Sequence, residues 1–262
     1  MAWGRGLSGQ LSVLDKATDR PVRPQPCQAS SARSALYFTD RVVQLGAGEN
    51  YTMVVTLKGD VYGCGTNECG ELGEANIAPV GTCKPMLALG GRDVLRVACG
   101  VQHVVAVTAL GEAFAWGLNR DGQLGLGHQR PPPLRTPQRV ALPDDCDEHH
   151  NWVDAAAGAA HTLGAVRGAD RSAAMTLYAW GDGSAGALGV GDASTRTRPT
   201  LIVFAGEAVR SGSRSREVVQ FACGARHSLL LCRDHSVLSV GLSADGRLGL
   251  PPALSPLSLI HI

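Results

Sequence analysis

A short sequence element recurs five times along this chain of 262 residues, and the repetition limits the fold more than any other feature. Each copy is a short extended run that ends in glycine and is followed, a few residues later, by a Gly-x-Leu segment. The clearest copy spans residues 113–125, and residues 177–189 match it closely. The glycine that ends the run stands at positions 4, 65, 117, 181 and 241, so the copies lie 52 to 64 residues apart. The chain is therefore expected to fold as a series of similar units.

A second element precedes four of these five copies, and its best example is the apolar stretch 94–103, which contains a Gly-x-x-His pattern. From this glycine to the glycine that ends the next run, the distance is 17, 17, 23 and 17 residues. The longer spacing contains about six extra residues near 167–172, where a surface loop would tolerate them. The pattern consists of Gly48 with Tyr51, Gly100 with His103, Gly158 with His161, and Gly224 with His227.

The apolar runs are five to seven residues long and rich in Val and Leu, which is typical of buried strands and too short for typical helices. Short antiparallel strands that repeat in this way predict a β-propeller, in which small residues let neighbouring blades approach and large ones fill the gaps. Asn119 is expected to hold its own loop by a hydrogen bond to the backbone. The structural motif comprises Gly100, His103, Trp116, Gly117, Asn119, Gly122, Leu124, Gly125, Gly158, His161, Trp180, Gly181, Gly224 and His227.

These residues resemble the repeat of the regulator of chromosome condensation family. In that repeat an aromatic strand ends in Trp-Gly, Asn-x-x-Gly-Gln-Leu-Gly follows, and Gly-x-x-His stands upstream. Residues 94–140 match the pattern almost throughout, and the resemblance covers about residues 2–16 and 41–258. It implies a propeller, which in this family usually has seven blades. The chain departs from the pattern where Tyr51 replaces His, where Cys64 and Val240 replace Trp, and where Gly6, Gly183 and Ser243 replace Asn.

The repeats predict a single all-β propeller domain over residues 1–262, with four full repeats and an N-terminal half repeat. Three interpretations of this number stay open: an open arc whose ends another chain covers, a smaller closed ring, and a truncated gene model. The half repeat is placed at about 1–16, an irregular connection at 17–40, and the full repeats at 41–90, 92–142, 152–204 and 217–262.

Composition excludes several classes of protein. Hydrophobic residues make up 44% of the chain and charged residues 18%, which excludes wholesale disorder. The formal net charge of +1 provides no general attraction to nucleic acid, and no apolar run is long enough for a membrane span, so neither partner is expected. The first ten residues lack the apolar core of a secretory signal, and the eight cysteines form no Cys-x-x-Cys pair. We therefore expect an intracellular protein, cytoplasmic or nuclear, with reduced thiols.

Two patterns in the repeats have the residue types of a functional site. Gly4-x-Gly6-x-x-Gly9 matches a dinucleotide fingerprint, but it begins too early in the chain for the strand that this fingerprint requires, and Gly4 and Gly9 belong to the repeat. Three histidines are zinc-ligand types, but equivalent places in separate blades should keep them apart. A structural hydrogen bond within each blade is the favoured interpretation for His103, His161 and His227.

Two further polar segments lie between the repeats. Residues 144–150 read Asp-Asp-Cys-Asp-Glu-His-His, with ligand types for a divalent cation, and a solvated loop is the favoured interpretation. The Ser/Gly/Arg segment that contains Arg210, Arg214 and Arg216 is a candidate interaction loop for phosphate or an acidic partner, although such loops more often only confer solubility.

Every strong signal belongs to the repeat, and no nucleophile, base and orienting acid recur at a recognisable spacing. The sequence therefore predicts a non-enzymatic protein–protein interaction scaffold that uses its propeller loops, or a subunit that packs against neighbours in a larger assembly. No catalytic residue, cofactor or metal is predicted. The family resemblance implies an alternative, because founding members resemble guanine-nucleotide exchange factors for the small GTPase Ran; a Ran-like GTPase is then the partner.

Overall fold

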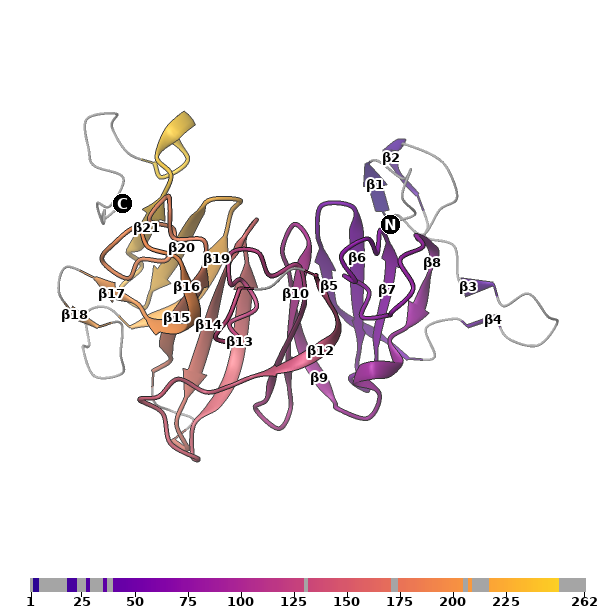
Figure 1. Cartoon of the computed structure of the whole chain (residues 1–262), viewed down its shortest axis with the longest axis horizontal. Coiled ribbons are helices and arrows are strands. Elements are labelled where there is room, and N and C mark those ends of the chain that lie inside the picture. Colours follow the sequence, from indigo (N-terminus) through magenta and orange to yellow (C-terminus); the bar gives the residue numbers. More distant parts are fainter. Residues whose placement is uncertain are drawn as a thin grey trace.

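The computed structural model describes residues 40–129, 132–170, 174–203 and 217–249 in full, together with the backbone of several short strands outside these ranges. Its main feature is a row of four antiparallel sheets, here called blades 1 to 4 (Figure 1). Blade 1 contains β5 (Val42–Ala47), β6 (Tyr51–Thr56), β7 (Val61–Gly65) and β8 (Val80–Pro85). Blade 2 contains β9 (Val94–Cys99), β10 (His103–Thr108), β11 (Ala113–Gly117) and β12 (Leu134–Val140).

The remaining blades follow in chain order. Blade 3 contains β13 (Asn151–Ala157), β14 (His161–Arg167), β15 (Thr176–Gly181) and β16 (Arg196–Leu201), and blade 4 contains β19 (Val218–Cys223), β20 (His227–Cys232) and β21 (Val237–Gly241). Within each blade the strands pair in the order in which they occur in the sequence, so every connection inside a blade is a hairpin or a longer loop between neighbours.

The blades are arranged as an arc. The first strand of each blade packs against the first strand of the next, in the order β5, β9, β13 and β19, so these strands line the inner side of the row. Blades 1 and 4 lie at opposite ends of the arc (Figure 1). The described sheets thus form an open arc rather than a smaller closed ring.

The three larger apolar cores lie between blades, because a single sheet buries its two faces against two different neighbours. A smaller cluster lies within blade 1. Strand β10 illustrates this arrangement: Val104 and Ala106 pack in the core shared with blade 1, and Val105 and Val107 pack in the core shared with blade 3. Every residue of β10 is buried. This two-sided burial explains why the second strands read as continuous apolar runs instead of alternating with polar residues.

The repeat motif sets a common register in all four blades. The residue that begins the second strand lies opposite the glycine that ends the third, as in His103 opposite Gly117. This glycine has a φ of +99°, and a Cβ on it would lie 2.4 Å from the carbonyl oxygen of Gln102. Only glycine fits such a conformation and such a close approach without strain. The equivalent pairs are Tyr51 with Gly65, His161 with Gly181, and His227 with Gly241.

The N-terminal strand pair has the register of the third and fourth strands of a blade. Strand β1 (Ala2–Gly4) pairs with β2 (Thr18–Val22) through Ala2 opposite Val22 and Gly4 opposite Thr18. Ala115 opposite Gln138 and Gly117 opposite Leu134 give blade 2 the same irregularity, two residues on one strand against four on the other. The half repeat at the N-terminus therefore corresponds to the outer half of a blade.

The other elements are short. Strands β3 (Cys27–Gln28) and β4 (Ala35–Leu36) pair, as do β17 (Val203–Phe204) and β18 (Glu207–Ala208), and two single-turn 3₁₀ helices occur at Leu87–Leu89 and Ala244–Gly246. Three of the short strands, β2 to β4, lie in the segment 17–40, for which the sequence predicts an irregular connection. Among the described residues, no helix has the length and apolar character needed to cross a membrane. The prediction of an all-β propeller with an incomplete number of blades is confirmed.

Candidate functional site

Two of the motif histidines lie at separate blade junctions and bond to the next blade, so the prediction of a bond within each blade is wrong for them. The third, His227, lies in blade 4, the last described blade. Nε2 of His103 lies 3.0 Å from Oγ1 of Thr162 in blade 3, and this hydroxyl donates to the carbonyl oxygen of Gln123 at 2.9 Å. Since the hydroxyl has a single hydrogen, it accepts from His103, which assigns the neutral Nε2–H tautomer to this ring. The next junction repeats the arrangement, with His161, the hydroxyl of Ser228 and the carbonyl oxygen of Ala187.

The same loop carbonyls receive the motif tryptophans. The indole of Trp180 donates to the carbonyl oxygen of Gln123 at 2.9 Å, and that of Trp116 donates to the carbonyl oxygen of Glu71 at 2.7 Å. Both indoles are fully buried. Each tryptophan therefore links its blade to the preceding one, and the Gly-x-Leu-Gly loop is a docking element for the next blade.

Glycines and Asn119 shape the loops that accept these bonds. Nδ2 of Asn119 donates to the carbonyl oxygen of His128 at 2.9 Å, while its Oδ1 accepts from the amide of Leu124 at 3.2 Å. A Cβ on Gly125 would lie 2.9 Å from the indole nitrogen of Trp180. Gly122 also has a positive φ in this loop. Gly100, Gly158 and Gly224 each lie against the imidazole three residues later, where a Cβ would come within 2.2, 2.2 and 1.9 Å of its Cε1.

The two ends of the row differ from its centre. At the junction of blades 1 and 2, Tyr51 replaces histidine, and its hydroxyl lies 2.9 and 2.7 Å from the carbonyl oxygens of Gly100 and His103. The longer phenol reaches the backbone of blade 2 directly, because Val104 there has no hydroxyl to accept an imidazole. In blade 4, His227 is partly exposed, and within the described residues no hydroxyl of a following blade accepts from its ring. Its Nδ1, like that of His103, is buried without a hydrogen-bond partner among the described residues.

Burial determines the charge of the inner histidines. Desolvation, with a smaller contribution from His161, lowers the pKa of His103 to about 3. Desolvation also lowers the pKa of His161 to about 4, against a partial offset from Asp182. Both rings are therefore neutral at pH 7 and act in structural hydrogen bonds.

The acidic segment 144–150 is a loop between β12 and β13 whose polar groups bond to each other and to blade 3. Nδ1 of His150 lies 2.7 Å from Oδ1 of Asp147, and the hydroxyl of Tyr178 donates to Oδ1 of Asp145 at 2.9 Å. Within the part of the chain that the structure describes, no three His, Cys, Asp or Glu side chains gather as metal ligands would. The candidate loop with Arg210, Arg214 and Arg216 lies outside the described residues.

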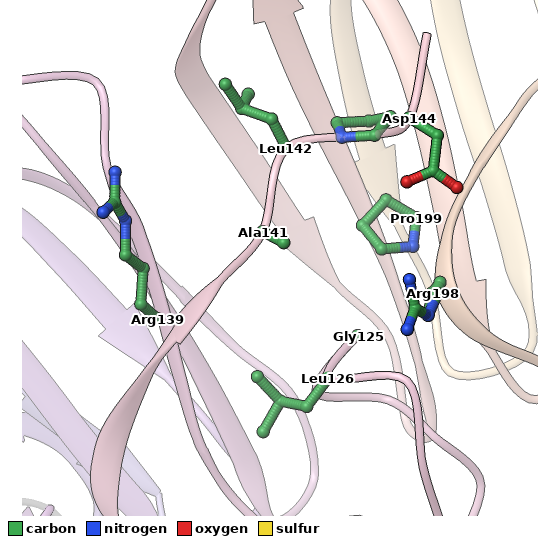
Figure 2. A pocket seen from close by; sticks show the side chains of 9 residues that line it. Gly125, Leu126, Arg139, Ala141, Leu142, Asp144, Arg198 and Pro199 are labelled. Carbon is green, nitrogen blue, oxygen red and sulfur yellow. The ribbon is translucent and has the colours of Figure 1, made fainter. Parts of the chain in front are cut away.

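Three adjacent cavities follow the connection from blade 2 to blade 3. The first has a volume of about 140 Å³ and lies between the loop at Gly125 and the connection that contains Arg139 and Asp144. Figure 2 shows Asp144 and Arg198 on one side of this cavity and Arg139 on the other. A cavity of this volume leaves little room for a ligand, and its charged side chains have both signs.

The second and third cavities are larger, about 530 and 480 Å³, and share part of their lining. We call them together the junction groove. Leu110, which is 76% exposed, stands on its rim, and Leu95, half exposed, lies beside the third cavity. Trp152, only 3% exposed, lines both cavities. The shared lining consists of Leu110, Gly111, Asn151 and Trp152.

The junction groove was not among the sites that the sequence predicts. A signal is nevertheless present when the repeats are aligned by their strand register. In this register Trp152, the second residue of β13, takes the place of the valines that begin the inner strands of the other blades: Val42, Val94 and Val218. The departure of one repeat from the other three thus identifies the groove.

The repeats themselves match known proteins. Residues 58–107, 111–165 and 176–231 match the model of the regulator of chromosome condensation (RCC1) repeat, and residues 42–71 and 94–123 match a second model of the same repeat. The chain belongs to the RCC1 repeat family. It is 33% identical over 249 residues to the ultraviolet-B receptor UVR8 of Arabidopsis thaliana, in a match that covers 95% of this chain and 50% of the receptor. It thus spans half the length of that relative.

A much larger relative contains a similar segment. The chain is 31% identical over 255 residues to the human E3 ubiquitin-protein ligase HERC2, a match that covers 94% of the chain and 5% of the ligase. Among solved structures, human WBSCR16 gives a TM-score of 0.73 at 21% identity and covers 99% of this chain and 61% of that one. Prp20p of Saccharomyces cerevisiae gives 0.65 at 22% identity, over 86% of this RCC1-repeat chain and 51% of Prp20p. These structural similarities establish the fold.

Proposed function

We propose that this RCC1-repeat chain is a non-enzymatic protein-interaction module whose binding surface is formed by loops and by the groove at the blade junction. The observation that carries the proposal is the use of the motif side chains. His103, His161, Trp116 and Trp180 are buried and bonded between blades, and the neutral histidines have pKa values far below 7. These groups stabilise the scaffold, so recognition is left to the surface between them.

The structural neighbours support protein partners. One solved structure contains Kap60 bound to the yeast RCC1 protein Prp20, and another study of Prp20p concerns its binding to Gsp1p and histones. By analogy, the partner of this chain is a protein, either a small GTPase or a neighbouring subunit of an assembly. The analogy rests on the shared fold.

Site-specific photocrosslinking tests the interaction function. A benzophenone amino acid at position 110, on the rim of the junction groove, is compared with one at position 87, where an equally exposed leucine lies in the 3₁₀ helix after blade 1. We expect discrete protein adducts from position 110 that a purified, unlabelled partner competes away. Turnover of a small-molecule substrate by the purified chain, abolished by one loop substitution, would instead identify an enzyme.

A second candidate function is guanine-nucleotide exchange on a Ran-like GTPase, and the similarity to Prp20p, studied for binding Gsp1p, favours it. An exchange factor accelerates release because it binds the nucleotide-free GTPase more tightly than the loaded form. Release of fluorescent GDP from Ran is measured with and without the chain. Acceleration at micromolar protein supports exchange, and an unchanged release rate removes it.

A further inference from the structure

Blades 3 and 4 each have an arginine at the end of the second strand, Arg167 and Arg233, and the residue opposite it differs. We call this part of a blade its corner. In blade 4, Arg233 follows the second strand, and its guanidinium bonds to the carboxylate of Glu217 at 2.6 Å. In blade 3, Arg167 occupies the same position in the ladder, opposite Asn151. Asparagine has the position of Glu217 but no negative charge, so blade 3 lacks the carboxylate that pairs with the cation in blade 4.

Arg167 has no substitute partner in the part of the chain that the structure describes. Its Nε is buried without a hydrogen bond, and no ion pair involves it. Arg139, the other cation at the junction groove, is paired with Glu112 at 3.5 Å. A buried donor without an acceptor costs free energy, and the cost is larger when the donor is charged. The groove therefore has one cation whose pairing is incomplete.

The residues around Arg167 indicate which kind of ligand could pair with its guanidinium. The third cavity combines apolar side chains, including Leu95, Leu110 and Val153, with polar groups, and Arg167 is the only charged residue in that lining. Trp152 contributes a second buried donor, since its indole nitrogen also lacks a partner among the described residues. A ligand that fits must bring an apolar group for the walls and a negatively charged acceptor for the donors.

We propose that the junction groove binds a peptide segment of a partner protein in which an apolar side chain adjoins a carboxylate, with Arg167 as the ion partner of that carboxylate. The inference rests on the proposed interaction function and assigns it a site and a ligand chemistry. Apolar contact with Leu95 and Leu110 provides area, and the ion pair provides specificity, because a charge-assisted hydrogen bond in a sheltered site is stronger than a neutral one.

The probes are fluorescein-labelled heptapeptides with one central Glu flanked by Leu, Ile, Phe or Trp, each matched by a peptide with Gln in place of Glu. Binding to the full chain is measured by fluorescence anisotropy up to 1 mM protein sites. At least one Glu peptide should bind about tenfold more tightly than its Gln counterpart. Equal affinity within every pair, or no binding by any peptide, overturns the proposal.

Variants assign the effect to the groove. Arg167→Gln should weaken the Glu peptide about tenfold, whereas Arg233→Gln, the matched change in blade 4 outside the groove, should leave its affinity unchanged. Asn151→Glu supplies the carboxylate that blade 4 has and should also weaken the peptide, by occupying Arg167 from within. Equal effects of Arg167→Gln and Arg233→Gln would place the peptide elsewhere and overturn the proposal.

A spectroscopic measurement distinguishes binding from loss of structure. The indole N–H resonance of Trp152, assigned by its absence in Trp152→Phe, should shift when the Glu peptide binds, and the Gln peptide should need about tenfold more peptide for the same shift. The photocrosslinking test of the interaction function does not depend on this peptide. Discrete partner adducts that persist in the Asn151→Glu variant would therefore retain the interaction function and reject the groove as its carboxylate site.

Discussion

The junction of blades 2 and 3 and the junction of blades 3 and 4 use the same backbone positions with different side chains. At the first, Trp180 and Thr162 both donate to the carbonyl oxygen of Gln123. At the second, Val240 replaces the tryptophan, and among the described residues only Ser228 donates to the corresponding oxygen of Ala187. The comparison teaches that both junctions keep the histidine–hydroxyl bond, while the indole, which the junction of blades 1 and 2 also has, is absent where Val240 stands.

The largest expected effect comes from removing the side chain that distinguishes the two junctions. Trp180→Ala leaves a large cavity and should lower the free energy of unfolding by about 3–5 kcal/mol. Val240→Ala, at the same place in blade 4, should cost about 1–2 kcal/mol, since less apolar surface is lost. Urea unfolding followed by circular dichroism gives both values, and similar losses would show that the indole adds nothing to its junction.

Acid should weaken the histidine bonds that the two junctions share. The pKa values of His103 and His161 are lowered in the folded state, to about 3 and about 4, while an unfolded histidine titrates near its ordinary value of about 6.5. The unfolded chain therefore binds protons first as the pH falls. Stability is complete above pH 6.5 and is lost progressively below it, by about 2 kcal/mol for each histidine at pH 5.

Urea unfolding at pH 7 and pH 5 measures this loss. His103→Gln removes one of the two most strongly shifted histidines and should make the difference between the two pH values smaller by about 2 kcal/mol. A pH dependence unchanged in that variant would contradict the neutral, buried ring at this junction.

Removing one hydroxyl tests the shared bond at neutral pH. Thr162→Val leaves the Nε2–H of His103 without an acceptor and should cost about 1–3 kcal/mol in the free energy of unfolding. His227→Gln is a control in blade 4, where no hydroxyl of a following blade accepts from the ring within the described residues. It should change stability by less than about 0.5 kcal/mol, as expected for partly exposed positions.

The smallest effect is expected at the corner of blade 4, where Arg233 has the carboxylate partner that Arg167 of blade 3 lacks. Glu217→Gln gives blade 4 the uncharged partner that blade 3 already has and should cost about 0.2–1 kcal/mol, because the Arg233 side chain is 64% exposed. Screening should abolish the difference from the unchanged protein in 1 M salt. A loss that persists at that salt concentration would mean that the pair contributes through packing instead of charge.

The repeat positions were predictable from the sequence because local patterns encode them. Gly117 was expected at the end of a strand, and it lies there, opposite His103 in the ladder. Its φ of +99° is a conformation that glycine adopts readily. The hydrogen-bond partner of His103 was not predictable, because Thr162 lies 59 residues further along the chain and in another blade. The replacement of histidine by Tyr51 was visible as a departure, but its bonds to the carbonyl oxygens of blade 2 were not.

The candidate groove was less predictable than the fold. Arg167 and Asn151 are ordinary surface residue types in the sequence, and neither belongs to the repeat motif. The strand register shows that they are equivalent to Glu217 and Arg233: Asn151 and Arg167 face each other in blade 3, and Glu217 and Arg233 form an ion pair in blade 4. Only the alignment of whole blades shows that blade 3 has an uncharged asparagine where blade 4 has a carboxylate.

The sequence by itself determined the unit, since the spacing of glycine, histidine and tryptophan specifies a small twisted sheet whose backbone conformations few other residues allow. Only the tertiary structure decided how units meet. A single sheet buries each face against a different neighbour, so the partners of His103, His161 and the two motif tryptophans lie 45 to 67 positions away in the sequence.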